Sequence, residues 1–181
     1  EDTSIPLGSI SASLNDTDGS ETLSLSITNV PAGAVLTDGT NSFTASAGNG
    51  SVNVSGWSLA SISITPPSNF AGTITLGVTA TATDSNGSTA VSQGSLPVVV
   101  TAVVDTPALA GPTTVITMAQ GSGAQSTINF PILATLRDTD GSEQLSIVVS
   151  GVPTGAAFNR GTNNGSGNWS FTAGDLADLT L

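Results

Sequence analysis

The stretch from Asp16 to Ile27 reads DTDGSETLSLSI, and it contains both features that decide the fold. Its first half is an acidic turn phrase, because Asp bonds readily to nearby backbone and Gly accepts positive φ. Its second half alternates apolar and hydroxyl residues, which is typical of a strand with one buried and one solvated face. Similar alternation occurs at residues 10–14, 51–54, 61–64, 73–82 and 96–103.

Turn phrases separate these alternating runs, for example at residues 31–33, 66–69 and 84–87. Short strands with turn signals at a spacing of about 8–12 residues are typical of β-sandwiches. No segment has a convincing helical period. The sequence therefore predicts an all-β fold.

The phrase DTDGSE returns at residues 138–143, 122 positions later (138 minus 16), and the match extends well beyond it. At that offset the apolar positions of residues 10–14 and 23–27 correspond to those of 132–136 and 145–149. Further along, the offset falls to 117 (171 minus 54), because one loop is shorter while the core positions persist. This internal repeat predicts tandem sandwich modules joined end to end.

The repeat divides the chain into two predicted domains, residues 1–104 and 105–181. Residues 65–104 have no counterpart in the second unit, and residues 113–118 are predicted to form that unit's first strand. On this alignment we expect the first unit to lack its first strand. We expect the second unit to lack its C-terminal strands, as in a truncated or split domain.

The composition excludes several functions. Charged residues make up 8% of the 181 residues, and the net charge is −11. Lys is absent, so nucleic acid and anionic lipid are unsuitable partners. His and Cys are absent too, which excludes Ser-His-Asp and Cys-His catalysis, His/Cys zinc sites and disulfides. No apolar run suits membrane insertion, and we expect no enzymatic activity.

Alternating strand directions bring the acidic phrases together at the ends of the modules. In a seven-stranded sandwich, the turn at residues 16–21 meets the turn at Asp84 at the upper end. Glu1 and Asp2 lie at the lower end, near the linker at Asp105. Each junction between modules then collects carboxylates from both of them.

A cation is the natural solution for such clusters. Three carboxylates about 5 Å apart repel by roughly 3 kcal/mol per pair at an effective dielectric constant of 20. Ca²⁺ takes 6–8 oxygens and suits such a cage better than Mg²⁺. The predicted Ca²⁺ ligands are Glu1, Asp2, Asp16, Asp18, Glu21, Asp84, Asp105, Asp138, Asp140 and Glu143. The alternative is that Asp-x-Asp-Gly is simply a good turn, whereas flanking strands exclude an EF-hand.

Other acidic and aromatic residues are assigned structural roles. Asp38 is interpreted as an ordinary turn residue, and Asp175 and Asp178 as solvated turn residues. Trp57 and Trp169 could stack on sugars, but a packing role is favoured because the two do not align in the repeat.

Six phrases together carry a family resemblance: EDTSI at 1–5, LNDTDGSE at 14–21, VPAG at 30–33, ITPPSNFAG at 64–72, ATD at 82–84 and VDTP at 104–107. With them the chain resembles the cadherin-like, immunoglobulin-like tandem repeats of giant bacterial RTX adhesins exported by type I secretion. The resemblance implies monomeric extender modules on the bacterial cell surface, rigidified by Ca²⁺, that serve attachment and biofilm formation. Their partners would be neighbouring repeats, while other domains bind a glycan or protein target. The family's ligands match Glu1, Asp16, Asp18, Asp84, Asp105, Asp138 and Asp140.

One departure and one alternative accompany the resemblance. Gly123 and Ala124 stand where the first unit has Glu1 and Asp2, so the second unit lacks that acidic pair. In the alternative interpretation, the chain is part of the adhesin's ligand-binding region. The second unit would then be a split domain that hosts an inserted lectin-like module.

Overall fold

The computed structural model describes residues 1–8, 10–16, 18–111, 126–138 and 140–181. Its strands pair antiparallel throughout, and within these residues the only helical segments are two short 3₁₀ turns, Leu59–Ser61 and Ala173–Asp175. The predicted all-β class is therefore confirmed. None of the described helices is long and apolar enough to cross a bilayer.

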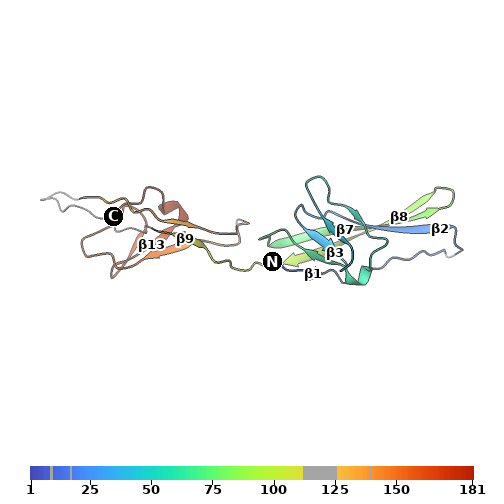
Figure 1. Ribbon diagram of the computed structural model, residues 1–181, viewed down its shortest axis with the longest axis horizontal. Helices are drawn as coiled ribbons and strands as arrows, with labels where there is room; N and C mark the ends of the chain where they lie inside the picture. The colour runs from blue at the N-terminus through green and yellow to red at the C-terminus, as the bar shows by residue number, and fades with distance from the viewer. Residues whose placement is uncertain (9, 17, 112–125, 139) are drawn as a thin grey trace. The chain divides into compact units, whose positions relative to one another are not determined.

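The chain forms two compact units, Glu1–Val103 and Val104–Leu181 (Figure 1). The predicted domain boundary between residues 104 and 105 lies one residue from this division. Each unit has a separate cluster of buried apolar residues. The two units are described in turn below.

The first unit contains two four-stranded sheets. One sheet has the order β1-β6-β3-β4, and its strands are β1 (Ile5–Pro6), β6 (Ser63–Thr65), β3 (Val35–Thr37) and β4 (Ser42–Thr44). The other has the order β5-β2-β7-β8, and its strands are β5 (Val52–Asn53), β2 (Glu21–Thr28), β7 (Gly72–Asp84) and β8 (Thr89–Val100). β7 lies between β2 and β8, so β8 is an edge strand (Figure 1).

Both sheets contribute to one apolar core. Leu36 and Ile64 come from the first sheet, while Ile27 and Leu76 come from the second, and all four are fully buried. Burial of such a side chain stabilises the fold by about 1.5–3 kcal/mol. The alternation in β2 gives one buried and one more exposed face, as predicted. Leu25 and Ile27 are buried, while Ser24 and Ser26 are only partly buried.

The strand predicted from the alternation at residues 10–14 is not formed. Ile5 and Pro6 pair with β6, but the described residues from 10 to 16 belong to no strand. Ile10 and Ala12 still pack against the core. The alternation therefore predicts which side chains face inward, whereas a strand also needs a hydrogen-bonded neighbour.

The second unit contains a two-stranded and a three-stranded sheet. β9 (Ala108–Ala110) pairs with β10 (Leu133–Thr135). β13 (Asn168–Thr172) lies between β11 (Ser146–Val149) and β12 (Thr162–Gly165). The strand predicted at residues 113–118 lies outside the described residues. Phe158 centres the core and makes edge-to-face contacts with Phe130, Trp169 and Phe171.

The register of the strands reproduces the sequence repeat. In the first unit Ile27 of β2 lies opposite Val52 of β5. In the second unit Val149 of β11 lies opposite Trp169 of β13. These residues correspond at the offsets of 122 and 117 (149 minus 27 and 169 minus 52). The shorter loop in the second unit therefore leaves the pairing of the flanking strands unchanged.

Candidate metal centre

The two copies of the acidic phrase fold into the same local turn. Oδ1 of Asp16 accepts a hydrogen bond from the backbone N–H of Asp18 at 3.1 Å, and Oδ1 of Asp138 accepts one from Asp140 at 2.9 Å. Asp18 and Asp140 bind in the same way to the N–H groups of Ser20 and Ser142. Gly19 and Gly141 complete the turns with φ values of 91° and 92°.

This geometry makes the turn interpretation and the ligand interpretation compatible. The first aspartate of each phrase, Asp16 or Asp138, uses Oδ1 for the turn, and its Oδ2 takes no part in that hydrogen bond. A carboxylate has about four acceptor positions, so one turn hydrogen bond does not exhaust it. The turn thus holds the side chain in one orientation without occupying its second oxygen.

In the second unit two carboxylates converge. Asp138 is 2% exposed, and its Oδ2 is buried and accepts no hydrogen bond from a described residue. Oε1 of Glu143 accepts a hydrogen bond from the backbone N–H of Asp105 at 3.1 Å, while its Oε2 is buried and likewise has no described partner. A carboxylate oxygen of Asp138 and one of Glu143 lie within 4.8 Å of each other.

This arrangement is costly for the protein alone. Two unit charges 4.8 Å apart repel by about 3 kcal/mol at an effective dielectric constant of 20. Buried polar atoms normally have partners, and each one left without costs about 1–3 kcal/mol. A bound cation would remove both costs, and oxygen ligands of this kind suit Ca²⁺.

The other two predicted ligands of the second unit lie close by in the chain. Asp105 is half-buried, and its backbone is held against Glu143 by the hydrogen bond described above. Asp140 is exposed at the turn that Asp138 organises. Neither carboxylate belongs to the buried pair. The roles of Asp105 and Asp140 as ligands therefore stay predictions.

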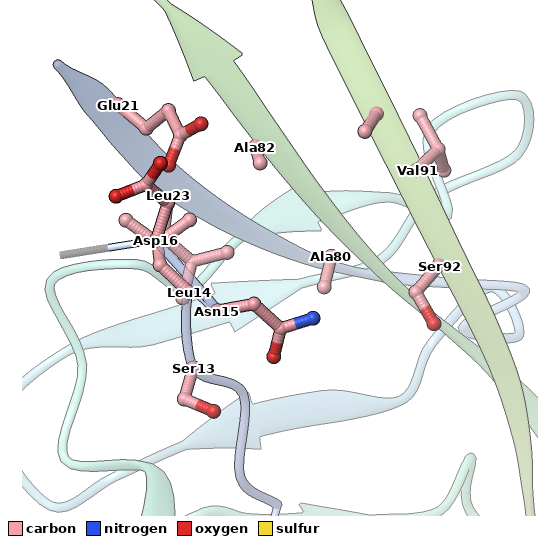
Figure 2. A pocket seen from close by; sticks show the side chains of 11 residues that line it. Ser13, Leu14, Asn15, Asp16, Glu21, Leu23, Ala80, Ala82, Val91 and Ser92 are labelled. Atoms are coloured by element: carbon pink, nitrogen blue, oxygen red, sulfur yellow. The ribbon is translucent and has the colours of Figure 1, made fainter.

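In the first unit four predicted ligands lie at one end of the longer sheet. Glu21 lies directly opposite Asp84 in the pairing of β2 with β7. Asp16 and Glu21 lie side by side at the rim of a hollow (Figure 2). Burial raises the pKa of Glu21, and the charges of Asp16, Asp18 and Asp84 raise it further. Hydrogen bonds from Ser20 lower the pKa of Asp18.

Glu1 and Asp2 lie away from this cluster. The N-terminal ammonium of Glu1 donates to the carbonyl of Thr101, and the N–H of Val103 donates to Oε1 of Glu1 at 3.2 Å. Glu1 therefore lies near the end of the sheet where Gly72 of β7 pairs with Val100 of β8. Asp84 is the last residue of β7 and lies at the opposite end of the same strands. Oδ1 of Asp2 accepts from the N–H of Asn69 at 2.8 Å, which ties two loops together.

Asp38 and Asp175, which the sequence predicts to be turn residues, have larger structural roles. Oxygens of Asp38 accept from the N–H groups of Thr40, Asn41 and Ser58 and from the side-chain amide of Asn41, which holds the pKa of Asp38 well below its usual range. Asp175 caps a 3₁₀ turn with Thr172, and hydrogen bonds from Thr172 lower its pKa. The Thr-x-x-Asp spacing was the available sequence signal for this cap.

The tryptophans pack rather than line an aromatic surface. Trp169 is buried, and its ring centroid lies 5.5 Å from that of Phe158. Trp57 is partly buried against the core of the first unit. The favoured packing role of Trp169 is therefore confirmed.

Comparisons with protein-family models, curated proteins and solved structures found no match for this chain. The chemistry of the site is therefore argued from its own residues. The acidic end of the first unit and the buried pair of the second unit share one turn design, but only the second has paired buried oxygens among the described residues.

Proposed function

We propose that the chain is a pair of tandem immunoglobulin/cadherin-like β-sandwich modules that extend a bacterial cell-surface adhesin of the RTX class. The two sheets around one core in the first unit support this proposal, as does the shared register of β2 with β5 and β11 with β13. Such modules act outside the cell after type I secretion and serve attachment and biofilm formation. Other domains of the adhesin would bind the glycan or protein target.

The observation that carries the proposal is the pair of carboxylates at Asp138 and Glu143. Their buried oxygens have no partner among the described residues and lie close together. Ca²⁺ binds carboxylates, carbonyls and water at 2.3–2.6 Å, and it takes 6–8 such oxygens. Asp105, Asp140 and water would supply further ligands around this pair.

Ca²⁺ would act on the linker through Glu143. The N–H of Asp105 donates to one oxygen of this carboxylate, so a cation on the other oxygen holds the linker residue in place. In the first unit Glu1 holds Val103 by the same kind of hydrogen bond, and one residue separates Val103 from Asp105. The predicted sharing of one ion by Glu1 and the carboxylates of the second unit remains a prediction.

Ca²⁺-dependent rigidity is the property that an extender needs. Without the cation, the carboxylates repel and the linker residues lose a fixed anchor. Extracellular Ca²⁺ modules bind with Kd values of about 10⁻⁴–10⁻³ M, so the ion would be bound outside the cell and scarce inside it. The module would thus become stiff only after export.

Small-angle scattering of the full chain tests the proposal. We expect a narrower distribution of particle dimensions in CaCl₂ than in EGTA for the wild type. The variant Asp138→Asn should lose this difference. Asp178→Asn is the matched control, because Asp178 is an exposed aspartate of the same unit and Asn accepts its positive φ of 55°. Identical scattering of the wild type in both buffers would refute the proposed function.

A further inference from the structure

We propose that the second unit binds a neutral hexose in a hollow that the first unit fills with its own chain. The hollow measures about 520 Å³, and small-molecule sites range from about 300 to 1,000 Å³. The turn of residues 151–156 and the hairpin of β12 and β13 line it. None of its lining residues is a predicted Ca²⁺ ligand, so the site goes beyond the proposed spacer role. Six of them bear on ligand binding: Thr154, Gly155, Ala156, Asn163, Ser166 and Trp169.

The first unit has a segment of its own chain at the corresponding place. At the offset of 122, Gly33 and Ala34 correspond to Gly155 and Ala156 (155 minus 33). They are covered by Ala45, which is only 2% exposed. The N–H of Gly33 donates to the carbonyl of Ala45 at 2.9 Å, and the N–H of Ala45 donates to the carbonyl of Ala34 at 2.9 Å. In the first unit, therefore, the chain itself uses one donor and one acceptor of this turn.

The second unit leaves this donor and this acceptor open. It is five residues shorter over the same stretch (122 minus 117), and its β12 pairs with β13, whereas β4 of the first unit pairs with β3. Among the described residues, neither the N–H of Gly155 nor the carbonyl of Ala156 forms a hydrogen bond. Both residues line the hollow, so a ligand there would find the two groups that Ala45 uses in the first unit.

The hollow does not arise from the end of the sequence at Leu181. In the first unit β3 lies between β4 and β6. Ala45 continues the pairing of β4, while Pro67 follows β6 and would lie 3.5 Å from a Cβ added to Gly33. The two residues thus flank Gly33 from opposite sides. At the offset of 117 the counterpart of Pro67 comes after Leu181, and it would approach Gly155 from the side away from the hollow.

Trp169 adds a polar group that the first unit lacks. Its side chain is 8% exposed, and its ring packs edge to face on Phe158. Its indole N–H has no hydrogen-bond partner among the described residues and is not fully buried. A buried tryptophan usually has a partner for this group, and the hollow that Trp169 lines has room for one. The first unit has Val52 at this position (169 minus 117), so the donor accompanies the hollow.

The chemistry of the lining favours a neutral ligand with several hydroxyl groups. No charged side chain lines the hollow. Residues 104–181 carry six carboxylates and two arginines, which disfavours an anion. An apolar ligand would leave the polar groups of Gly155, Ala156 and Trp169 unpaired, which is unfavourable. Sugar hydroxyls both donate and accept hydrogen bonds, so they can pair with all three.

The rim offers further hydrogen bonds to such a ligand. The hydroxyl-bearing residues Thr154 and Ser166 are exposed there. Oδ1 of Asn163 accepts from the N–H of Gly165 at 2.9 Å, which leaves the amide NH₂ of Asn163 for a ligand. The ring of Trp169 is packed in the core, so the sugar would be held by hydrogen bonds rather than by stacking on the ring.

NMR spectroscopy of the full chain tests the inference. The chain has two tryptophans, so its nitrogen–proton correlation spectrum contains two indole signals, which the variant Trp57→Phe assigns. We expect at least one of glucose, galactose and mannose, added singly, to shift the Trp169 signal in a saturable way and to leave the Trp57 signal unchanged. The titrations are run in EDTA, so their outcome is separate from that of the Ca²⁺ proposal. No saturable shift with any of the three sugars, or equal shifts of both signals, would overturn the inference.

Matched variants locate the binding. Thr154→Phe places a large side chain at the rim and should weaken sugar binding by about tenfold or more. Thr162→Phe is the control, because Thr162 is an exposed threonine of the same unit that does not line the hollow. Equal affinities of the two variants would place the sugar elsewhere and overturn the inference.

A peptide with the sequence of residues 44–50 is the competing occupant, since this stretch contains the Ala45 that covers the turn in the first unit. It is titrated in the same way and followed by the Trp169 indole signal. We expect it to bind more weakly than the best of the three sugars. Tighter binding of the peptide than of every sugar would assign the hollow to a chain segment, and would also overturn the inference.

Discussion

The substitution Asp138→Asn should make the second unit more stable without Ca²⁺ and less responsive to it. The asparagine keeps the Oδ1 acceptor that the N–H of Asp140 uses in the turn. It removes one of two charges whose oxygens lie within 4.8 Å of each other. The new amide could also donate a hydrogen bond to Oε2 of Glu143, which has no described partner.

The expected magnitudes follow from these distances. At an effective dielectric constant of 20, loss of the repulsion raises the free energy of unfolding in EDTA by up to about 3 kcal/mol. If the wild type binds Ca²⁺ as proposed, the ion at a hundred times its Kd would add about 2.7 kcal/mol by mass action. The variant should lose most of that gain, so the order of stability reverses between the two buffers.

Urea denaturation followed by tryptophan fluorescence measures both quantities. In every protein of this experiment Trp57 is replaced by phenylalanine, so the signal comes from Trp169 in the core of the second unit. Asp178→Asn controls for the loss of one carboxylate elsewhere in the same unit. If Asp138→Asn is less stable than the wild type in EDTA and keeps its full response to Ca²⁺, the electrostatic argument is wrong.

Three further outcomes are expected. Phe158→Ala should lower the free energy of unfolding of the second unit by about 3–5 kcal/mol, because it removes three edge-to-face contacts and leaves a cavity; Trp169 fluorescence in urea measures this loss. The raised pKa of Glu21 means that the folded first unit binds the proton more tightly than the unfolded chain, so its stability falls as the pH rises above about 4.5, the ordinary value for this side chain. Glu21→Gln should flatten this fall in thermal denaturation followed by Trp57 in EDTA, and parallel pH profiles would contradict the crowding of carboxylates. Asp38 has a lowered pKa, so its contribution exists above its ordinary value of 3.8 and is lost as the pH falls further. Asp38→Asn should therefore lower the Tm of the first unit at pH 7 but not in strong acid, and an equal decrease at both would show that ionisation is irrelevant.

Local sequence pattern was sufficient for the strands whose neighbours are also evident from the sequence. The alternation in residues 23–27 and 73–82 predicted β2 and β7, which pair with each other over eight residues from Glu21 to Thr28. The repeat predicted the equivalence of β2 with β11 and of β5 with β13. These successes share a cause, because period-two burial and strand pairing support each other along a sheet.

The local sequence pattern was insufficient where a segment's structure depends on a partner that is distant in the sequence. Residues 10–14 alternate as clearly as their counterparts 132–136, yet only the latter include a strand, since β9 pairs with them. Asp38 reads as an ordinary turn residue, because its partner Ser58 is 20 positions away and no local spacing reveals the contact. Long-range hydrogen bonds of this kind are decided by the packing of loops.

The two copies of DTDGSE show what a motif can and cannot encode about a metal centre. Both copies fold into the same turn, with Oδ1 of the first aspartate bound to the second aspartate's N–H. In the second unit that first aspartate is buried and its Oδ2 lies near Glu143, whereas Asp16 is exposed. Identical residues thus give identical turns but different surroundings. If the second unit binds the proposed cation, its affinity would therefore depend on the segments packed around the turn, and above all on Asp105, whose N–H holds Glu143.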